Sequence, residues 1–376
     1  MWFRNLTLYT IDLSPLSAEA FIKGLMSRPF HECDPHREAS SGFVPLLANS
    51  PELFTLSIGG DILFSMRTDK KLVPGDTKKK AVAAAIEEFH SRNGRYPSRI
   101  ERRDLKEDAI NALFPLAFAV ESRTRAWINR GAGLLVIDTA SKKEAERLVL
   151  ALIRTLKVDL KVRPLATNWK PSDAMTHWVN EGEGPFGFTV DTDTVFSTNN
   201  GSGHVKYENT ELCAEEINRH AHLGNHVLSL AMTGPGKVSF ALMSDGSLRR
   251  VSALDVLMQA KHEDLTSLSG DFLLMSATFL RILEALFDSL DGIKLEESPM
   301  PDVGGAEIQD DDMYPQARAL VIKEQRASTS LVQRHLRIGY NRAARLMNEL
   351  EERHVVSVQN EHGNRTVLVE AAHESA

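Results

Sequence analysis

Cations and side-chain amides gather in one short stretch near the end of the chain. Between Lys323 and Arg345 there are six Lys or Arg residues and a single carboxylate, Glu324, which gives a net charge of +5. Cationic side chains neutralise phosphates and release counterions, while a guanidinium fork fits guanine and an amide fits adenine. These residue types therefore predict contacts to the backbone and to the base edges of a nucleic acid.

Helical periodicity predicts how these groups are held. Ala343, Leu346, Met347 and Leu350 have the spacing of a buried helix face, so the cations of this segment face outward. The segment "RIG" supplies a tight turn after a short helix through "SLVQRHL", which Ser328 or Thr329 caps. A first helix in "DMYPQARALVIKEQ" and a hairpin of "VVSV" with "TVLV" complete a winged helix-turn-helix. The alternative is a solvated helix face.

These residues also carry a resemblance to a known domain. The stretch "VQRHLRIGYNRAARLMNELEERHVVSVQNEHGNRTVLV" resembles the gamma domain of the bacterial DNA translocase FtsK, a winged helix that reads short polar DNA sequences. The resemblance covers about residues 311–370. It implies that Asn341, Arg342 and Arg345 contact base edges. Arg334 and Arg337 would hold the DNA backbone, and Asn364 with Arg365 would form the wing.

Composition limits the class of protein. The 376 residues are 42% hydrophobic and 25% charged, which is ordinary for a globular protein of two or three domains. The net charge of −7 does not favour nucleic acid, so only the distribution of charge argues for it. Cys33 and Cys213 lie far apart, which predicts a reducing compartment, and no secretory signal or membrane span is visible. We expect a cytoplasmic, nucleoid-associated protein.

Two segments bear on what the C-terminal domain is attached to: one argues against a motor ATPase, and the other marks the domain boundary. "TGPGKVSF" at 233–240 lacks the first glycine of a phosphate-binding loop and has Val238 where Ser or Thr would hold magnesium, so it predicts a hairpin turn. Residues 296–312 carry seven carboxylates, two prolines and no Lys or Arg, which predicts a flexible acidic linker. An ordered acidic loop is the alternative.

The first 295 residues mix strands and helices without a regular alternation. The pattern predicts an α+β fold in which antiparallel strands have helices on one side. Ser98 is expected to cap one helix, and Ser141 with Glu144 to form a capping box at another. The main predicted strands are 2–11, 52–59, 61–71, 119–129, 133–140, 187–198, 203–209, 225–233, 237–244 and 247–253. The main predicted helices are 17–27, 76–94, 98–118, 172–182, 213–224, 254–264 and 270–290.

Charge is uneven within this region. Between Arg67 and Lys106 there are twelve Lys or Arg against six Asp or Glu, a net charge of +6. One side of the region could therefore face DNA. Cations that merely solvate two helices are the alternative.

A second resemblance covers this region. "MWFRNLTLY", "RTDKKLVPG", "FPLAFAVESRTRAWIN", "LLVIDTASKKEAERLV", "AMTHWVNEGEGPFGFTVD" and "DFLLMSATFLRILEALFDSL" resemble, in order, the RdgC family of recombination-associated proteins, over about residues 1–295. The resemblance implies a protein that is not an enzyme and needs no cofactor or metal. Two horseshoe-shaped subunits would close a ring-shaped homodimer around double-stranded DNA and restrain the RecA recombinase.

The same resemblance assigns residues to the ring. Phe118 would close the gate between subunits, although a core aromatic is the alternative reading. The resemblance implies that Lys70, Lys71, Arg123 and Arg125 face the hole. We expect Lys78, Lys79 and Lys80, which belong to the cationic stretch between Arg67 and Lys106, to face it as well.

Together these inferences predict residues 1–295 as a DNA-encircling region, 296–312 as a linker, 313–370 as a winged helix and 371–376 as a disordered tail. The winged helix would direct the ring to particular DNA sites. The alternatives are an adaptor that docks a site-specific tyrosine recombinase, since FtsK gamma domains also contact one, and an unrecognised metal-dependent nuclease.

Three clusters of metal-binding or catalytic residue types are weaker candidates. His31, Cys33 and His36 lie close in sequence, and incidental proximity is favoured over a metal site. His220, His222 and His226 are interpreted as polar residues at a helix end. Asp191 and Asp193 are interpreted as solvated side chains.

Overall fold

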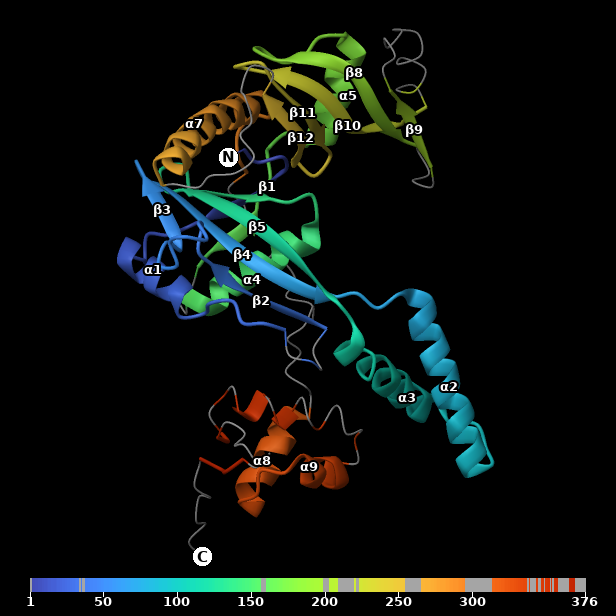
Figure 1. The fold of residues 1–376 in the computed structure, drawn as a ribbon. Coiled ribbons are helices and arrows are strands. Elements are labelled where there is room, and N and C mark those ends of the chain that lie inside the picture. The colour runs from blue at the N-terminus through green and yellow to red at the C-terminus, as the bar shows by residue number, and fades with distance from the viewer. Residues whose placement is uncertain are drawn as a thin grey trace, which may run out of the picture. The chain divides into compact units, whose positions relative to one another are not determined.

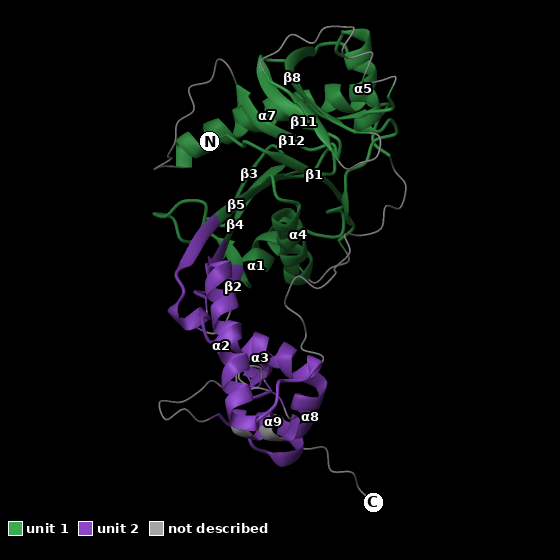
Figure 2. Cartoon of the chain, turned by 90° about the vertical axis from the view of Figure 1, so that its right-hand side faces the viewer, with its two compact units in different colours: residues 1–30, 42–67, 123–303 green, residues 31–41, 68–122, 304–376 purple. Residues whose placement is uncertain are grey.

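A computed structural model describes residues 2–368, with gaps at 34, 36–37, 157–159, 199–202, 209–219, 221–222, 254–264, 295–312, 337, 339–342, 344–345, 348, 352, 354 and 358–364, and with the backbone alone at 330 and 334. The chain divides into two compact units, coloured in Figure 2. Unit 1 is residues 1–30, 42–67 and 123–303, and unit 2 is residues 31–41, 68–122 and 304–376.

One sheet runs through the described strands, in the order β2-β4-β5-β6-β1-β12-β11-β10-β8-β9, with β3 on β4 and β7 on β1 (Figure 1). The N-terminal strand lies inside it, because Leu6 is opposite both Asp138 of β6 and Leu248 of β12 in antiparallel register. The strands are β1 Leu6–Ile11, β2 Ala39–Val44, β3 Thr55–Ile58, β4 Asp61–Lys71, β5 Ala119–Asn129, β6 Leu134–Asp138, β7 Val162–Pro164, β8 Thr189–Ser197, β9 His204–Tyr207, β10 His226–Gly234, β11 Val238–Met243 and β12 Leu248–Ala253.

Helices cover both faces of the sheet in unit 1, which corrects the expectation of helices on one side. Successive strand residues enter different cores: Trp127 packs in one, and Ala126 and Ile128 pack in the other. The first core includes α5 (Pro171–Glu181) and α7 (Leu265–Ser289), and the second includes α1 (Ala18–Met26) and α4 (Lys142–Leu156). The strands of this region are apolar on both sides for this reason.

Most predicted elements of the first region are present with shifted ends. The helix expected at 98–118 stops at Asn111 as α3 (Arg99–Asn111), and a 3-10 turn, η1 (Phe114–Leu116), follows it. Pro115 lacks the amide that a continuing helix needs. The edge strand β2 was missed because "ASSGFV" begins with small residues. The helices expected at 213–224 and 254–264 lie outside the described residues, apart from His220 and the turn at Leu223 and Gly224.

Capping follows the sequence at one helix and departs from it at another. The Ser98–Glu101 capping box of α3 is complete, with both reciprocal bonds. At α4, Ser141 Oγ accepts from the Glu144 amide (3.4 Å), but the Ser141 amide donates to Thr139 Oγ1 (3.1 Å). Thr139 in turn donates to the Glu144 carboxylate (2.8 Å), so it completes a wider network than the predicted box.

The C-terminal segment has a core of its own. Ala343, Leu346, Met347 and Leu350 are each 0% exposed, which confirms the predicted apolar stripe. They pack with α8 (Tyr314–Glu324) and α9 (Thr329–Leu336). Two isolated bridges, Ala327 with Arg365 and Val356 with Val367, join the chain end to earlier residues.

The predicted hairpin turn at 233–240 is confirmed, since β10 and β11 pair from Gly234 opposite Val238. Among the described helices, we find none with the length and apolar content needed to cross a lipid bilayer.

Candidate nucleic-acid interface

A pair of helices in unit 2 has almost no core. α2 (Gly75–Asn93) fully buries no side chain, and α3 fully buries only Asn111. Each helix nevertheless has one half-buried face, such as Val82, Ile86 and Phe89 of α2, which agrees with the predicted amphipathic pattern. We call residues 75–111 the arm; its two helices lie side by side (Figure 1). The two helices therefore pack on each other and contribute no residue to the three hydrophobic cores of the described residues.

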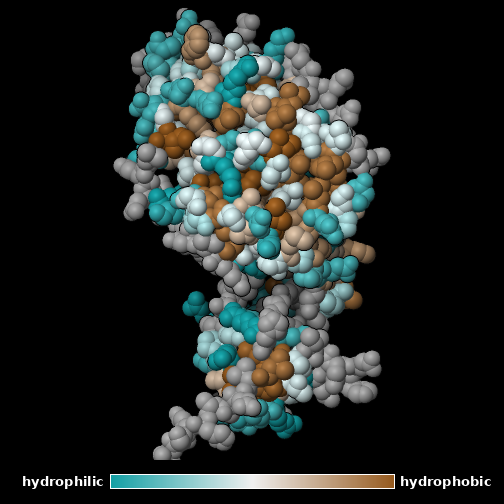
Figure 3. All heavy atoms as spheres, turned by 90° about the vertical axis from the view of Figure 1, so that its left-hand side faces the viewer, coloured by the Kyte–Doolittle hydropathy of each residue, from teal (hydrophilic) through white to brown (hydrophobic). Residues whose placement is uncertain are grey.

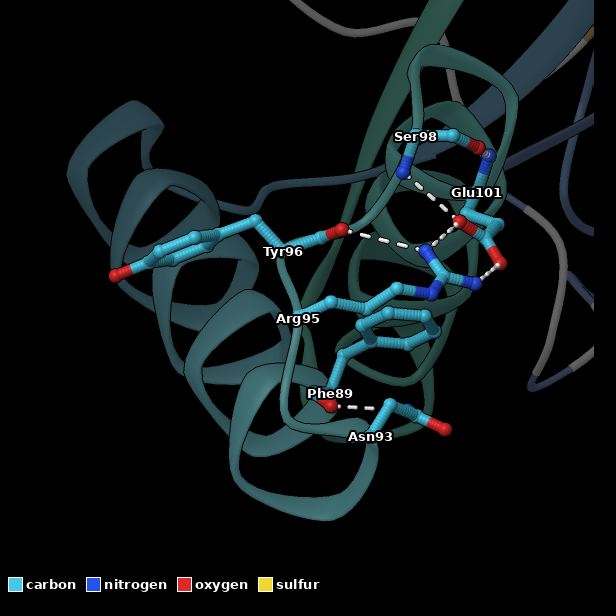
Figure 4. Close-up of polar contacts among 6 residues, drawn as sticks. All are labelled: Phe89, Asn93, Arg95, Tyr96, Ser98 and Glu101. Carbon is cyan, nitrogen blue, oxygen red and sulfur yellow. Dashed lines mark hydrogen bonds and ion pairs between the residues drawn. The ribbon is translucent and has the colours of Figure 1, made fainter.

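The turn at the end of the arm is held by a fork of hydrogen bonds (Figure 4). Arg95 donates to both carboxylate oxygens of Glu101 at 2.8 and 2.7 Å, and Glu101 also accepts from the Ser98 amide at 2.8 Å. The Arg95 guanidinium also lies 5.3 Å from the centre of the Phe89 ring. The hydrogen bond from Arg95 lowers the pKa of Glu101 to about 2, so the fork stays charged at neutral pH.

The cations of α3 share one face. Arg99, Arg102, Arg103 and Lys106 are spaced by three and four residues and all are exposed. We call them the α3 stripe. The four carboxylates of α3 are half-buried: Glu101, Asp104, Glu107 and Asp108. Asp104 lies 3.5 Å from Arg103 Nε, so it pairs with one cation of the stripe. These four cations were included in the net charge of the stretch from Arg67 to Lys106 but were not named as candidate DNA contacts. Their spacing of three and four residues could have identified them as one helix face.

The three lysines predicted at the start of α2 are accessible to different degrees. Lys79 and Lys80 are exposed and Lys78 is half-buried. Lys79 lies 3.4 Å from Asp76, with 82% and 88% of the two side chains exposed. A pair this exposed is worth little, so a phosphate can replace the carboxylate.

Lys70 and Lys71, at the end of β4, are both engaged by the segment before β2. Lys71 is only 7% exposed and donates from Nζ to the Pro35 carbonyl at 2.6 Å. Lys70 is exposed and lies 3.7 Å from a carboxylate oxygen of Glu38. In this arrangement Lys70 is open to solvent, whereas the ammonium of Lys71 is committed to a backbone carbonyl.

Arg123 and Arg125 lie on one face of β5 in unit 1 but differ in environment. Arg123 is exposed, while Arg125 is half-buried beside Asp138. Burial lowers the pKa of the Arg125 guanidinium and raises the pKa of the Asp138 carboxyl, which also accepts from the backbone amides of Arg4 (2.9 Å) and Asn5 (3.1 Å). Asp138 therefore offsets part of the charge that Arg125 could offer to a ligand.

Phe118 is not a core aromatic of this chain. Its side chain is 88% exposed, and three apolar neighbours in sequence or space are exposed as well: Leu72 at 61%, Leu116 at 83% and Val120 at 48%. The Leu72 amide donates to the Phe118 carbonyl at 3.0 Å, which brings the two chain segments together. We call these four residues the gate patch. Apolar clusters of this kind mark contact surfaces.

Apolar side chains also reach the surface of unit 1. Figure 3 shows several apolar patches there among polar side chains. Leu273 and Leu274 of α7 are 53% and 52% exposed, and Phe186, before β8, is 101% exposed.

The C-terminal segment holds only part of its predicted interface within the described residues. Arg337, Asn341, Arg342, Arg345 and Asn364 lie outside them. Arg334 is described by its backbone, within α9. Arg365 is described, and its Nε lies 2.6 Å from Glu351 Oε2, with 11% and 24% of the two side chains exposed.

The weaker candidates have partners within the protein. Asp191 accepts from Thr233 Oγ1 at 3.0 Å, and Asp193 lies 3.4 Å from Arg250, so these carboxylates are not simply solvated.

His220 and His226 each contact other side chains of the chain. His220 contacts the Tyr207 hydroxyl at 2.7 Å and the Asn225 side chain at 3.0 Å, and His226 lies 4.0 Å from Asp173. His36 and His222 fall outside the described residues. Within the described part of the chain, His31 and Cys33 belong to no group of three metal-binding side chains.

Comparisons with known proteins match both segments. The family described as "Putative exonuclease, RdgC" matches residues 1–293, and the "Ftsk gamma domain" matches residues 308–370. The chain is similar to the recombination-associated protein RdgC of Paraburkholderia phymatum, with 31% identity over 78% of this chain and 97% of that protein. It is 32% identical to those of Aeromonas hydrophila, over 78% of this chain and 98% of that protein, and Pseudomonas paraeruginosa, over 80% and 99%.

Proposed function

The chain belongs to the RdgC family through residues 1–293 and carries an FtsK gamma domain at residues 308–370, and on this premise we propose that it binds double-stranded DNA and modulates RecA-dependent recombination. The RdgC region holds the duplex without reading its sequence. The C-terminal domain, a winged helix in this proposal, directs the protein to particular DNA sites.

The observation that carries the proposal is the separation of charge on α3. Its four cations are exposed and its four carboxylates are half-buried. A polyanion outside the arm could contact these four cations. Arg103 would exchange its pair with Asp104 for a phosphate, and that pair is worth little because 72% and 49% of the two side chains are exposed. Lys79, Lys80, Lys70 and Arg123 add further exposed cations.

Closure of a ring is the second part of the proposal. The gate patch supports it, because Phe118 and its three exposed apolar neighbours fit a self-complementary contact between two copies of the chain. A closed homodimer would retain DNA topologically, so modest phosphate contacts would suffice for long residence.

Sequence preference is assigned to the C-terminal domain. Asn341, Arg342 and Arg345 would contact base edges and Arg334 with Arg337 the backbone, in line with the buried stripe that turns the opposite helix face outward. Arg342→Ala should cost ~1–3 kcal/mol for the preferred duplex alone. Deletion of 311–376 should leave nonspecific binding intact and remove site preference, and an unchanged footprint would reject this assignment.

The α3 stripe gives the sharpest test of DNA binding. Fluorescence anisotropy of a labelled duplex in a salt series should give a slope of log affinity on log salt of about −5 for roughly six phosphate contacts. Arg102→Gln with Lys106→Gln should reduce the magnitude of the slope by about two. Lys142→Gln with Lys143→Gln, two exposed cations of α4, is the control with equal loss of charge and should leave the slope unchanged.

A flat salt response of the wild type would remove DNA from the proposal. Equal effects of the α3 and α4 variants would instead show that net charge matters and the stripe does not.

A nuclease is the second candidate, because the matching family is described as an exonuclease. We propose binding without cleavage, since Asp191 and Asp193 are held by Thr233 and Arg250. Linear and plasmid DNA incubated with the protein and magnesium should remain intact. Degradation that Asp191→Asn abolishes would establish the nuclease instead.

A further inference from the structure

Main-chain hydrogen bonds and bridges connect residues 365–368 to earlier residues of the C-terminal domain. Arg365 bridges to Ala327, and the Ser357 amide donates to the Thr366 carbonyl at 2.8 Å. The Leu368 amide donates to the Val355 carbonyl at 2.9 Å. We call residues 365–368 the wing base; these main-chain bonds hold it against Ala327, Val355 and Ser357.

An ion pair joins the wing base to the helical segment that holds the buried Leu346, Met347 and Leu350. The predicted base-reading residues precede this segment in the sequence. Arg365 Nε lies 2.6 Å from Oε2 of Glu351, which is helical and follows the buried Leu350. With 11% and 24% of the side chains exposed, the pair is poorly screened by water and salt. Charge-assisted contacts of this length also fix direction.

The position of Glu351 argues that the pair is maintained. A carboxylate near the end of a helix is opposed by the partial negative charge of the helix C-terminus, so Glu351 is unfavourable there without a cation. A half-buried carboxylate left alone would also be costly. Arg365 supplies the compensating charge from a different element.

A second ion pair in the same domain does not involve the wing base. Arg353 lies 2.6 Å from Glu349, at 41% and 10% exposure, and its guanidinium is 4.1 Å from the centre of the Tyr314 ring. That pair ties the same helical region to α8. Glu351 thus pairs with the wing base, whereas Glu349 pairs with Arg353, which lies outside it.

We propose that Arg365 and Glu351 form a lock that sets the angle between the wing and the base-reading helix, and that Arg365 is a positioning residue rather than a DNA contact. The inference rests on the proposed function of the C-terminal domain. A wing that swings freely cannot be matched to a phosphate while the helix is in the groove, so the lock contributes to sequence preference and not to charge neutralisation.

The test uses the full chain with Glu351→Gln, Arg365→Gln, the double variant and the exchanged pair Glu351→Arg with Arg365→Glu. Affinity is measured for a panel of duplexes in a salt series. Each single variant should lower the ratio of preferred to nonspecific affinity by about tenfold. The double variant should be no worse than either single one, the exchanged pair should recover part of the loss, and the salt slope should not change.

Glu349→Gln is the matched control, because it breaks an ion pair of equal length in the same helix. It should lower the melting temperature of the domain and leave the preference ratio unchanged. If Glu349→Gln lowers the ratio as much as Glu351→Gln, the effect is loss of stability and the lock is overturned.

Two further outcomes separate the inference from the proposed function. If Arg365→Gln flattens the salt slope by about 0.9 while Glu351→Gln leaves affinity unchanged, Arg365 contacts a phosphate and the lock is wrong. If the wild type prefers no duplex, the proposed sequence readout fails. In that case hydrogen exchange tests the Arg365–Glu351 lock independently of DNA binding. The amides of Ser357 and Leu368 should exchange faster in Glu351→Gln, and unchanged rates would overturn the lock.

Discussion

Phe118→Ser is expected to open the proposed ring without unfolding the subunit. The side chain is 88% exposed, so its removal takes almost nothing from the core of the chain. The backbone bond from the Leu72 amide to the Phe118 carbonyl does not depend on the side chain and should persist. Any loss of association therefore reports on the contact with a second copy.

The size of the effect follows from symmetry. Burying an exposed phenylalanine stabilises by about 1.5–3 kcal/mol. A twofold contact contains the residue twice, so the dimer should lose about 3–6 kcal/mol, which weakens its Kd by a factor of about 10² to 10⁴. The melting temperature of the subunit should change little, because surface substitutions fall within about 0.5 kcal/mol.

Analytical ultracentrifugation across a concentration series measures this Kd. Phe186→Ser is the matched control, since Phe186 is equally exposed but lies in unit 1, outside the gate patch. Phe114→Ser is the opposite control, because Phe114 is 4% exposed and its loss should unfold part of the chain. A Phe118→Ser dimer with the wild-type Kd would refute the gate assignment.

Three other substitutions test local energetics. Because the folded pKa of Glu101 is lowered to about 2 from 4.5, its fork with Arg95 should stabilise the arm above pH about 4.5 and lose this effect as the pH falls through about 2; hydrogen exchange of the arm should show this, and Glu101→Gln should remove it. Leu346→Ala should cost about 2–5 kcal/mol and lower the melting transition of the C-terminal core in calorimetry, and an unchanged transition would contradict the packing described. Lys71→Ala should lower the free energy of unfolding by about 1.5–3 kcal/mol in urea through loss of its bond to Pro35, whereas equal values for Lys71→Ala and exposed Lys79→Ala would argue against that bond.

Local patterns in the chain were enough to place most elements and one core. The spacing of Ala343, Leu346, Met347 and Leu350 predicted a buried stripe, and all four are fully buried. Ser98 was expected to cap a helix, and it does. Periodicity and capping succeed because they depend on residues within one or two turns of each other. The two family resemblances rest on such local motifs and are matched over 1–293 and 308–370.

Residue roles in the interface depended on contacts between distant segments. Lys70 and Lys71 are adjacent in sequence, yet only Lys71 is buried, because the segment at Pro35 folds over it. Arg125 is offset by Asp138 through sheet pairing, and Arg365 is held by Glu351.

The sequence left the exposure of Phe118 open between a gate and a core position, and it did not predict that helices cover both faces of the sheet. A sequence fixes which charges and apolar groups exist and how they repeat along the chain. Whether each one meets solvent, a carboxylate or a core is decided by long-range packing, because solvation and Coulomb energies depend on everything within several ångströms, whichever part of the chain supplies it.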